Sequence, residues 1–171
     1  MTNTTVKYEL VGHVAVITLN DPATLNAFSD AMIEALGQAL DRAEAEAGAI
    51  VLTGEGKGFS SGLNLGLAPA EKQSREQRDT GARLERVFNP LLLRLRNLAI
   101  PLVIAANGVA AGIGCSIALV GDFIVASEKA YFLQAFASIG LVPDGGSPFL
   151  LAAAAGRVRA MEMMQIGRAH V

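Results

Sequence analysis

The sequence predicts an α/β fold, in which buried strands alternate with helices. Short apolar runs, as at 49–53 and 102–106, have the length and composition of buried strands. Other segments have apolar residues at helical spacing, as at 32–40. Strands that alternate with helices along the chain are typical of an α/β protein. Both strands lead into glycine-rich segments, where backbone N–H groups can be aimed at a ligand.

The composition describes an ordered protein of about one domain. Hydrophobic residues make up 51% of the 171 residues and charged residues 18%, which argues against a disordered chain. The 14 basic and 16 acidic side chains leave a net charge of -2, so the charge balance favours neither nucleic acid nor an anionic membrane as partner. The sequence shows neither a signal peptide nor an apolar run of membrane-spanning length, and we expect a cytoplasmic protein.

Cysteine and histidine are too scarce for a structural metal site. Cys115 is the only cysteine, which excludes an internal disulfide, and its apolar surroundings predict a packed thiol. His13 and His170 are the only histidines. We therefore expect no metal.

The N-terminal third is predicted to form strand, strand, helix, strand. Residues 8–10 and 13–19 favour two short strands around a Val-Gly turn, and 20–25 is a turn around an Asp-Pro pair. Ser29 is expected to cap a helix that runs to about Ala47. The buried strand at 49–53 follows.

A glycine-rich loop and a charged segment come next. Residues 54–66 contain five glycines, which predicts a loop that turns sharply or touches a ligand. Residues 71–86 are highly charged and indicate a solvated helix or a mobile flap. Residues 87–98 continue as helix, with leucines along one face.

The segment from 100 to 122 organises the rest of the chain. The strand at 102–106 leads into small residues that include Gly108, Gly112 and Gly114, and this turn is predicted to open a helix. The first N–H groups of a helix have no partner within it, so a developing oxyanion could bind there. The alternative is a tightly packed core turn without a ligand.

The C-terminal part continues the alternation. Residues 123–126 indicate a strand, 127–130 a turn, and Tyr131 and Phe132 a brief extended piece. Residues 139–147 form a loop that carries one acid, Asp144. Two helices are predicted after it, at 148–155 and 158–165.

Familiar catalytic motifs do not account for these loops. Gly58 to Gly62 fits the G-x-S-x-G pattern of serine hydrolases, but that mechanism needs a histidine later in the chain, and only His170 follows. The glycine loops match neither a dinucleotide fingerprint nor a P-loop. Two glycine loops and one acid remain. Two converging N–H groups can hold a carbonyl oxygen while Asp144 moves a proton beside it, which predicts enolate chemistry.

Four blocks in a fixed order resemble the crotonase superfamily, the enoyl-CoA hydratase and isomerase group. They are LNDPATLNAFS at 19–29, VLTGEGKGFSSGLNL at 51–65, ANGVAAGIGCSIALVGDFIVAS at 106–127 and IGLVPDGG at 139–146. The resemblance implies an α/β fold built as a spiral of ββα units and a full-length homotrimer or dimer of trimers. It also implies an acyl-CoA thioester as substrate, with coenzyme A entering only as part of that substrate and no resident cofactor.

The same resemblance implies the site residues. The backbone N–H groups of Leu63 and Ile113 would form the oxyanion hole, and Asp144 would be the acid. The residues expected to bind coenzyme A and substrate are Leu25, Asn26, Ala27, Ser61, Leu63, Asn64, Leu65, Gly66 and Gly112.

Three departures from the family pattern bear on the reaction. Ile113 replaces the middle glycine of a Gly-Gly-Gly triplet, and its side chain is expected to narrow the acyl pocket. The two glutamates of the hydratases fall on Ser116 and Phe136, and neither is a general base near neutral pH. Asp144 in VPDGG resembles the single acid of Δ3,Δ2-enoyl-CoA isomerases and of epoxyphenylacetyl-CoA isomerases.

We therefore expect an acyl-CoA isomerase. The alternatives are a hydratase with unusual catalytic residues and a non-catalytic acyl-CoA-binding homologue. Asp144 itself has a second interpretation, as a turn-forming aspartate before two glycines. If it is buried against Phe136, Ile139 and Leu141, its pKa should rise.

The last residues suggest a foreign tail. Residues 166–171, IGRAHV, back-translate to the start of a common sequencing adapter. We therefore expect residues 1–165 to be a C-terminally truncated crotonase-type core domain and residues 166–171 to be an artefact.

Overall fold

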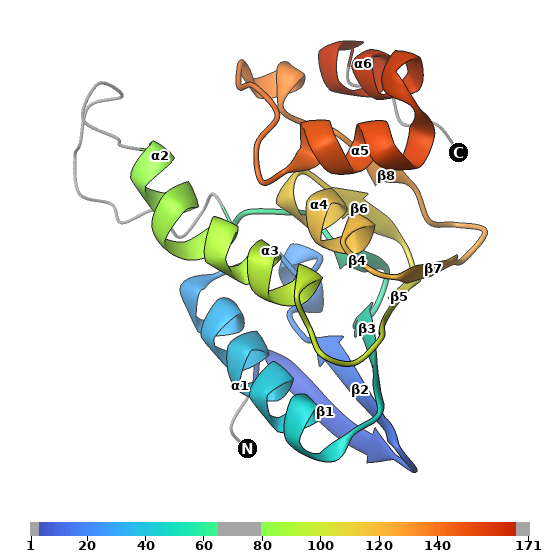
Figure 1. Ribbon diagram of the computed structural model, residues 1–171. Coiled ribbons are helices and arrows are strands. Elements are labelled where there is room, and N and C mark those ends of the chain that lie inside the picture. The colour runs from blue at the N-terminus through green and yellow to red at the C-terminus, as the bar shows by residue number, and fades with distance from the viewer. Residues whose placement is uncertain (1–3, 65–79, 167–171) are drawn as a thin grey trace.

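A five-stranded sheet forms the base of the molecule. The computed structural model describes residues 4–64 and 80–166 (Figure 1). The sheet has the order β1-β2-β3-β5-β7. Its strands are β1 (Val6–Val11), β2 (Val14–Leu19), β3 (Ala49–Gly54), β5 (Leu102–Ala106) and β7 (Phe123–Ala126). β1 and β2 are antiparallel and joined by a tight turn, whereas the later strands are parallel and need longer crossovers.

Helix α1 (Asp30–Glu46) connects β2 to the parallel strand β3. It begins where the sequence predicts, because the Ser29 hydroxyl accepts a hydrogen bond from the Met32 amide at 3.2 Å. Its apolar stripe faces the sheet, and the buried members are Met32, Leu36, Ala39, Leu40 and Ala43.

A second helical segment, as long as α1, lies beside it (Figure 1). It consists of α2 (Thr80–Arg83), a π-helical turn η4 (Leu84–Phe88) and α3 (Asn89–Arg96). Arg83 pairs with Asp30 near the start of α1, and Arg94 pairs with Asp41 further along, so the two helices run in the same direction. The predicted charged segment 71–86 lies only partly within the described residues, and its described end is helical.

A second sheet differs from the sequence prediction. It is parallel, has the order β4-β6-β8, and consists of β4 (Gly58–Ser60), β6 (Val109–Ala111) and β8 (Phe132–Leu133). The sequence indicated a loop over the first strand and a turn over the second. Both are three residues long and rich in small side chains, so they carry no alternation that marks a strand.

The remaining described elements are three helices and two short 3₁₀ turns. α4 (Ile113–Leu119) begins directly after β6, and α5 (Ser147–Ala155) and α6 (Arg157–Ile166) lie above it in Figure 1. The 3₁₀ turns are η1 (Pro22–Thr24) and η5 (Ala137–Ile139). Within the described residues, no helix combines the length and apolar character needed to cross a bilayer.

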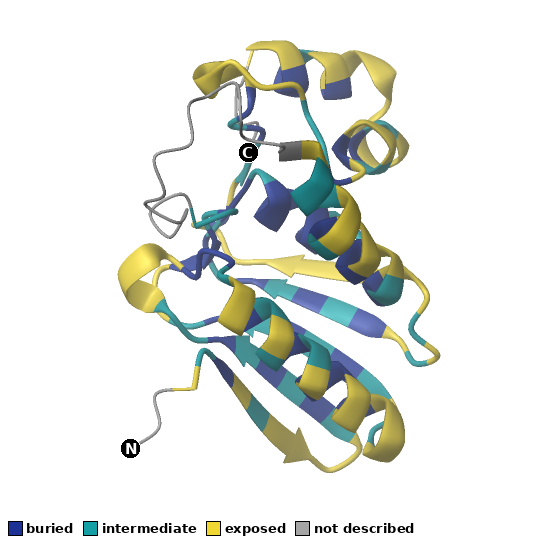
Figure 2. Ribbon diagram, turned by 90° about the vertical axis from the view of Figure 1, so that its left-hand side faces the viewer, coloured by how far each residue is buried: buried dark blue, intermediate teal, exposed yellow. Residues whose placement is uncertain are grey.

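The core lies between the large sheet and its helices. Along β2, β3 and β5 fully buried residues alternate with partly exposed ones, whereas β7 at the edge is exposed at all four positions (Figure 2). The largest buried side chains include Phe28, Phe59, Leu52 and Ile104. The sheet is therefore closely packed along its central strands β2, β3 and β5 and open at β7.

Candidate functional site

The two glycine turns and the loop that carries Asp144 meet around one cavity of about 200 Å³, here called the central cavity. Residues 61–63 and 112–113 line one side of it. Leu84 and Phe88 contribute from the helix beside α1. The remaining lining residues are Ala135, Phe136, Ile139, Leu141 and Asp144. The lining is mostly apolar with few polar groups, as is usual for sites that bind organic ligands.

The backbone N–H groups of Leu63 and Ile113 lie at this cavity. The Gly62 carbonyl accepts from the Phe28 amide at 2.7 Å, and the Asn64 amide donates to the Phe28 carbonyl at 3.1 Å. The amide of the intervening Leu63 therefore faces the opposite side. Ile113 is the first residue of α4, so its N–H has no partner within the helix. Leu63 and Ile113 both line the central cavity, so the two turns that carry these N–H groups meet there. An oxyanion hole requires two such donors at one site.

Glycine at position 62 permits this approach. Gly62 has φ +97°, and a Cβ there would lie 2.8 Å from the Ala111 carbonyl oxygen and 3.6 Å from the Ile113 nitrogen. Contacts of 2.8 Å are shorter than real Cβ atoms tolerate. Any side chain at position 62 would therefore separate the two turns.

Asn26 and Ser60 hold the first turn in shape. Both are fully buried. The Asn26 side-chain amide donates to the carbonyls of Glu55 and Gly58 at 3.0 and 2.9 Å. The Ser60 hydroxyl donates to the Asn26 carbonyl at 2.8 Å and accepts from the Gly62 amide at 3.1 Å. Ser60 is therefore a structural residue, and the G-x-S-x-G pattern does not mark a nucleophile here.

Asp144 is half-buried at the central cavity. Burial raises the pKa of its carboxyl group, as expected from the sequence. Phe136 contributes a buried side chain to the same cavity, whereas Ile139 and Leu141 are 56% and 49% exposed. Among the described residues that line the cavity, Asp144 is the one with an ionisable side chain. The arrangement offers two N–H donors and one carboxyl group, which can stabilise an oxyanion and move a proton.

The two positions at which the hydratase glutamates were expected have different surroundings. Phe136 lines the central cavity. Ser116 is fully buried and is not among the lining residues, and its hydroxyl lies 2.6 Å from that of Ser147. Ser147, whose amide donates to the Asp144 carbonyl at 2.9 Å, carried no signal in the sequence.

The residues expected to bind coenzyme A lie in several places. Ser61, Leu63 and Gly112 line the central cavity, and Asn64 follows Leu63 directly. Of the residues at 25–27, Leu25 is 38% exposed, whereas the other two are buried, and all three lie outside the lining of the central cavity. The Asn26 side chain donates its hydrogen bonds to backbone carbonyls of the protein, so this residue holds the 25–27 segment in shape. Leu65 and Gly66 lie outside the described residues.

Cys115 is a packed thiol, as predicted. It is fully buried, and the Gln134 side-chain amide donates to its sulfur at 3.1 Å. Burial raises the pKa of Cys115 to about 12, so the thiol is not a nucleophile near neutral pH. Within the part of the chain that the structure describes, no group of three or more His, Cys, Asp or Glu residues could hold a metal ion.

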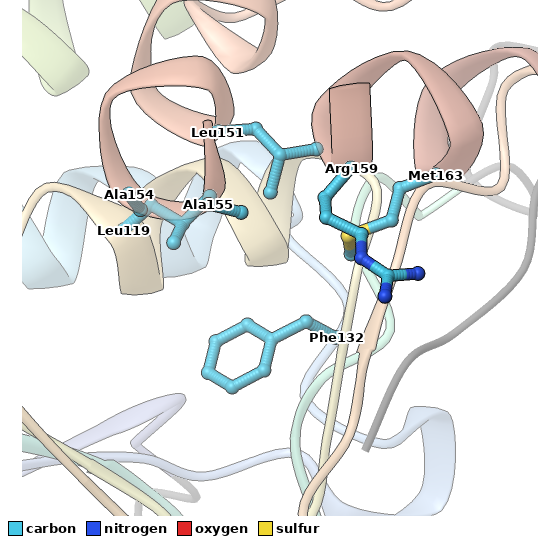
Figure 3. Close-up of a pocket in the computed structure, with 7 residues that line it drawn as sticks. All are labelled: Leu119, Phe132, Leu151, Ala154, Ala155, Arg159 and Met163. Atoms are coloured by element: carbon cyan, nitrogen blue, oxygen red, sulfur yellow. The ribbon is translucent and has the colours of Figure 1, made fainter. Parts of the chain in front are cut away.

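A second pocket of about 440 Å³ lies between α4, β8, α5 and α6 (Figure 3). Its lining consists of Leu119, Phe132, Leu151, Ala154, Ala155, Arg159 and Met163. The one charged member, Arg159, pairs with Glu162 at 3.2 Å. Because its described lining contains neither an acid nor a nucleophile, this pocket lacks the groups for chemistry that the central cavity has.

The chain matches known proteins along most of its length. The model of the enoyl-CoA hydratase/isomerase family matches residues 9–170. A probable enoyl-CoA hydratase of Rhodobacter capsulatus is 43% identical over 93% of this chain and 60% of its own length. The 1,2-epoxyphenylacetyl-CoA isomerase of Escherichia coli strain K12 is 40% identical over 90% of this chain and 59% of its own length.

A solved structure supports the fold. The enoyl-CoA hydratase of Polaromonas sp. JS666 superimposes with a TM-score of 0.84 at 31% identity, over 96% of this chain and 64% of that one. Compared with the two curated relatives named above, the chain spans about 60% of their length. The predicted α/β crotonase-type fold is confirmed. The chain belongs to the enoyl-CoA hydratase/isomerase family of the crotonase superfamily.

Proposed function

We propose that this chain carries the catalytic core of an acyl-CoA isomerase that works through a thioester enolate. The observation that carries the proposal is the lining of the central cavity, where Asp144 is the one ionisable side chain among the described residues. Shifting a double bond needs a single group that takes a proton from one carbon and returns it to another. Hydration needs, in addition, a way to activate water.

The residues support a two-step reaction on a 3-enoyl-CoA. The Asp144 carboxylate takes a proton from the carbon next to the thioester carbonyl, and the electron pair moves onto the carbonyl oxygen. The amides of Leu63 and Ile113 stabilise that oxyanion by hydrogen bonding, which is typically worth several kcal/mol, about 3 per donor. Asp144 then returns the proton two carbons further along, which gives the conjugated 2-enoyl-CoA. The raised pKa makes Asp144 a stronger base than an exposed aspartate.

A hydratase is the second candidate, because the Rhodobacter capsulatus relative is named a probable enoyl-CoA hydratase. In that reaction Asp144 alone would have to activate water and supply the proton. The Escherichia coli relative, named an isomerase, supports the first candidate at similar identity. A non-catalytic acyl-CoA-binding protein would keep the cavity without turnover.

The experiment is turnover of a 3-enoyl-CoA to its conjugated isomer, followed by ultraviolet absorbance, in the wild type and in Asp144→Asn. The variant should lose at least about a hundredfold in kcat, because the amide neither accepts nor returns a proton. Asp41→Asn is the matched control, since Asp41 is 74% exposed on α1 and pairs only at the surface.

The outcomes separate the candidates. Turnover that survives in Asp144→Asn would contradict the proposed role of Asp144. Hydration of a 2-enoyl-CoA without isomerisation would favour the hydratase. A folded wild type that binds acyl-CoA without either reaction would favour the binding protein.

The full-length form is also proposed to be a homotrimer or a dimer of trimers. The resemblance to the crotonase superfamily supports this, together with the exposed apolar edge strand β7, where Phe123 is 69% and Val125 63% exposed. Sedimentation equilibrium of the full-length protein tests it, and a monomer at micromolar concentration would contradict it.

A further inference from the structure

Two mostly apolar cavities adjoin the turn that follows Asp144. The central cavity contains Ile113 and Asp144 in its lining. A second cavity of about 240 Å³, here called the rear cavity, has Leu92, Gly145 and Phe149 in its lining. Asp144 and Gly145 are consecutive, and Phe88 and Leu92 lie one helical turn apart, so the cavities share a wall.

The wall consists of two methyl groups against a glycine. A Cβ placed on Gly145 would lie 2.2 Å from Cδ1 of Ile113 and 3.3 Å from Cδ1 of Leu92. The Ile113 side chain therefore occupies the space that a side chain at position 145 would need. Ile113 is only 5% exposed, so this end of its side chain is enclosed in the wall.

We propose that the Ile113 side chain sets the length of the acyl group by closing the central cavity against Gly145 and Leu92. This inference rests on the proposed function, because that function places the thioester oxygen at the Leu63 and Ile113 amides and the reacting carbons beside Asp144. An acyl chain that extends beyond Asp144 meets the wall or turns outward past the exposed Ile139 and Leu141. The enclosed part of the site thus holds only a short length of the acyl group, and any further carbons stay in contact with water.

The wall predicts how affinity depends on chain length. Each further methylene that becomes buried should tighten binding about fourfold. In the wild type this gain should stop once the chain reaches Ile113. Without the Ile113 methyl group the central and rear cavities join, and the gain should continue for longer chains.

The test uses isothermal titration calorimetry with butanoyl-, hexanoyl-, octanoyl- and dodecanoyl-CoA. Ile113→Ala opens the wall. Ile113→Val removes only the Cδ1 atom at a small cost in stability, so it can be used if Ile113→Ala folds poorly. Leu119→Ala is the matched control, because Leu119 is also on α4 but lines the pocket of Figure 3 instead.

The expected result is a plateau in wild type and Leu119→Ala, with dodecanoyl-CoA binding at least about tenfold tighter to Ile113→Ala than to wild type. Adding Gly145→Ala to Ile113→Ala should restore the plateau, because the new methyl group would lie close to the place that Cδ1 of Ile113 leaves, although φ +55° at position 145 adds backbone strain. The same length dependence in wild type and both Ile113 variants would overturn the inference.

These saturated esters have no double bond to move, so the readout is independent of turnover. A shifted plateau in a protein that isomerises no 3-enoyl-CoA would support the wall and contradict the proposed function. If the protein isomerises a 3-enoyl-CoA but the plateau is the same in the Ile113 variants as in wild type, the proposed function is supported and the wall is contradicted. Failure of every acyl-CoA to bind the folded protein would overturn both.

Discussion

The two sides of the central cavity are built differently. On the amide side, the residues of the turns at 60–63 and 111–114 are buried or partly buried, and the turns pack against each other. A Cβ on Gly62 or Gly114 would lie 2.8 Å from a carbonyl oxygen of the opposite turn. On the acid side, residues 137–142 are all exposed and Val142 is 80% exposed. The end of this loop packs on α4 at Gly145 and Ser147.

The difference fits what each side is proposed to do. N–H donors stabilise an oxyanion best when their dipoles are fixed in advance, which close backbone packing provides. A carboxyl group that serves two carbons needs some freedom. The loop is exposed over residues 137–142, while two contacts connect its end to α4, between Ile113 and Gly145 and between Ser116 and Ser147. Changes on the amide side should therefore cost most.

The largest effect should come from a methyl group on the amide side. In Gly62→Ala the Cβ would meet the Ala111 carbonyl, and φ +97° is strained for any side chain. We expect a loss of stability of about 2–4 kcal/mol by chemical denaturation and a fall in kcat/KM of at least about a hundredfold.

Gly140→Ala is the matched control on the acid side. Gly140 also has a positive φ, +73°, but a Cβ there would meet nothing within 4 Å. Only the backbone strain remains, about 1 kcal/mol. Equal losses in the two variants would show that crowding does not distinguish the sides.

An intermediate effect should come from the hydroxyl pair that ties the acid side to α4. Ser116→Ala or Ser147→Ala leaves one buried hydroxyl without its partner, and each should cost about 1–3 kcal/mol. The double variant removes both hydroxyls and should cost less than the sum. Thermal melts of the four proteins measure this coupling, and additive losses would contradict it.

The smallest effect should be the pH dependence of stability at Asp144. Because burial raises the folded-state pKa, the unfolded chain loses this proton first as pH rises. Stability should therefore fall from the ordinary aspartate pKa up to the raised one and then level off. Asp144→Asn should melt slightly higher than wild type at neutral pH, with no difference in acid below both pKa values. A lower melting temperature at neutral pH would contradict the sign.

Long, patterned elements were predictable from the sequence. The strands at 102–106 and 123–126 have the predicted bounds, and α1 begins after Ser29 as its capping pattern indicates. The first strand was predicted too short, since it extends from Val6 to Val11 rather than over 8–10. The additional residues are Val6, Lys7 and Val11, and their place in the strand depends on pairing with β2 opposite.

The positions of the candidate site residues were also predictable, but not their packing. Leu63, Ile113 and Asp144 lie at one cavity, as the order of the glycine loops suggests. The contact between Ile113 and Gly145 joins residues 32 positions apart, and the Ser116–Ser147 pair joins two helices. Small residues and lone serines have no periodicity, so local patterns do not reveal such contacts.

The sequence by itself determined the α/β fold, the glycine turns and the single acid, because each depends on residue type and local spacing. Tertiary structure alone decided that Ser60 and Asn26 are structural, that Ser116 lies outside the cavity lining and that Ile113 packs on Gly145. These outcomes depend on which buried atoms meet across the chain, and close packing of the folded state sets them.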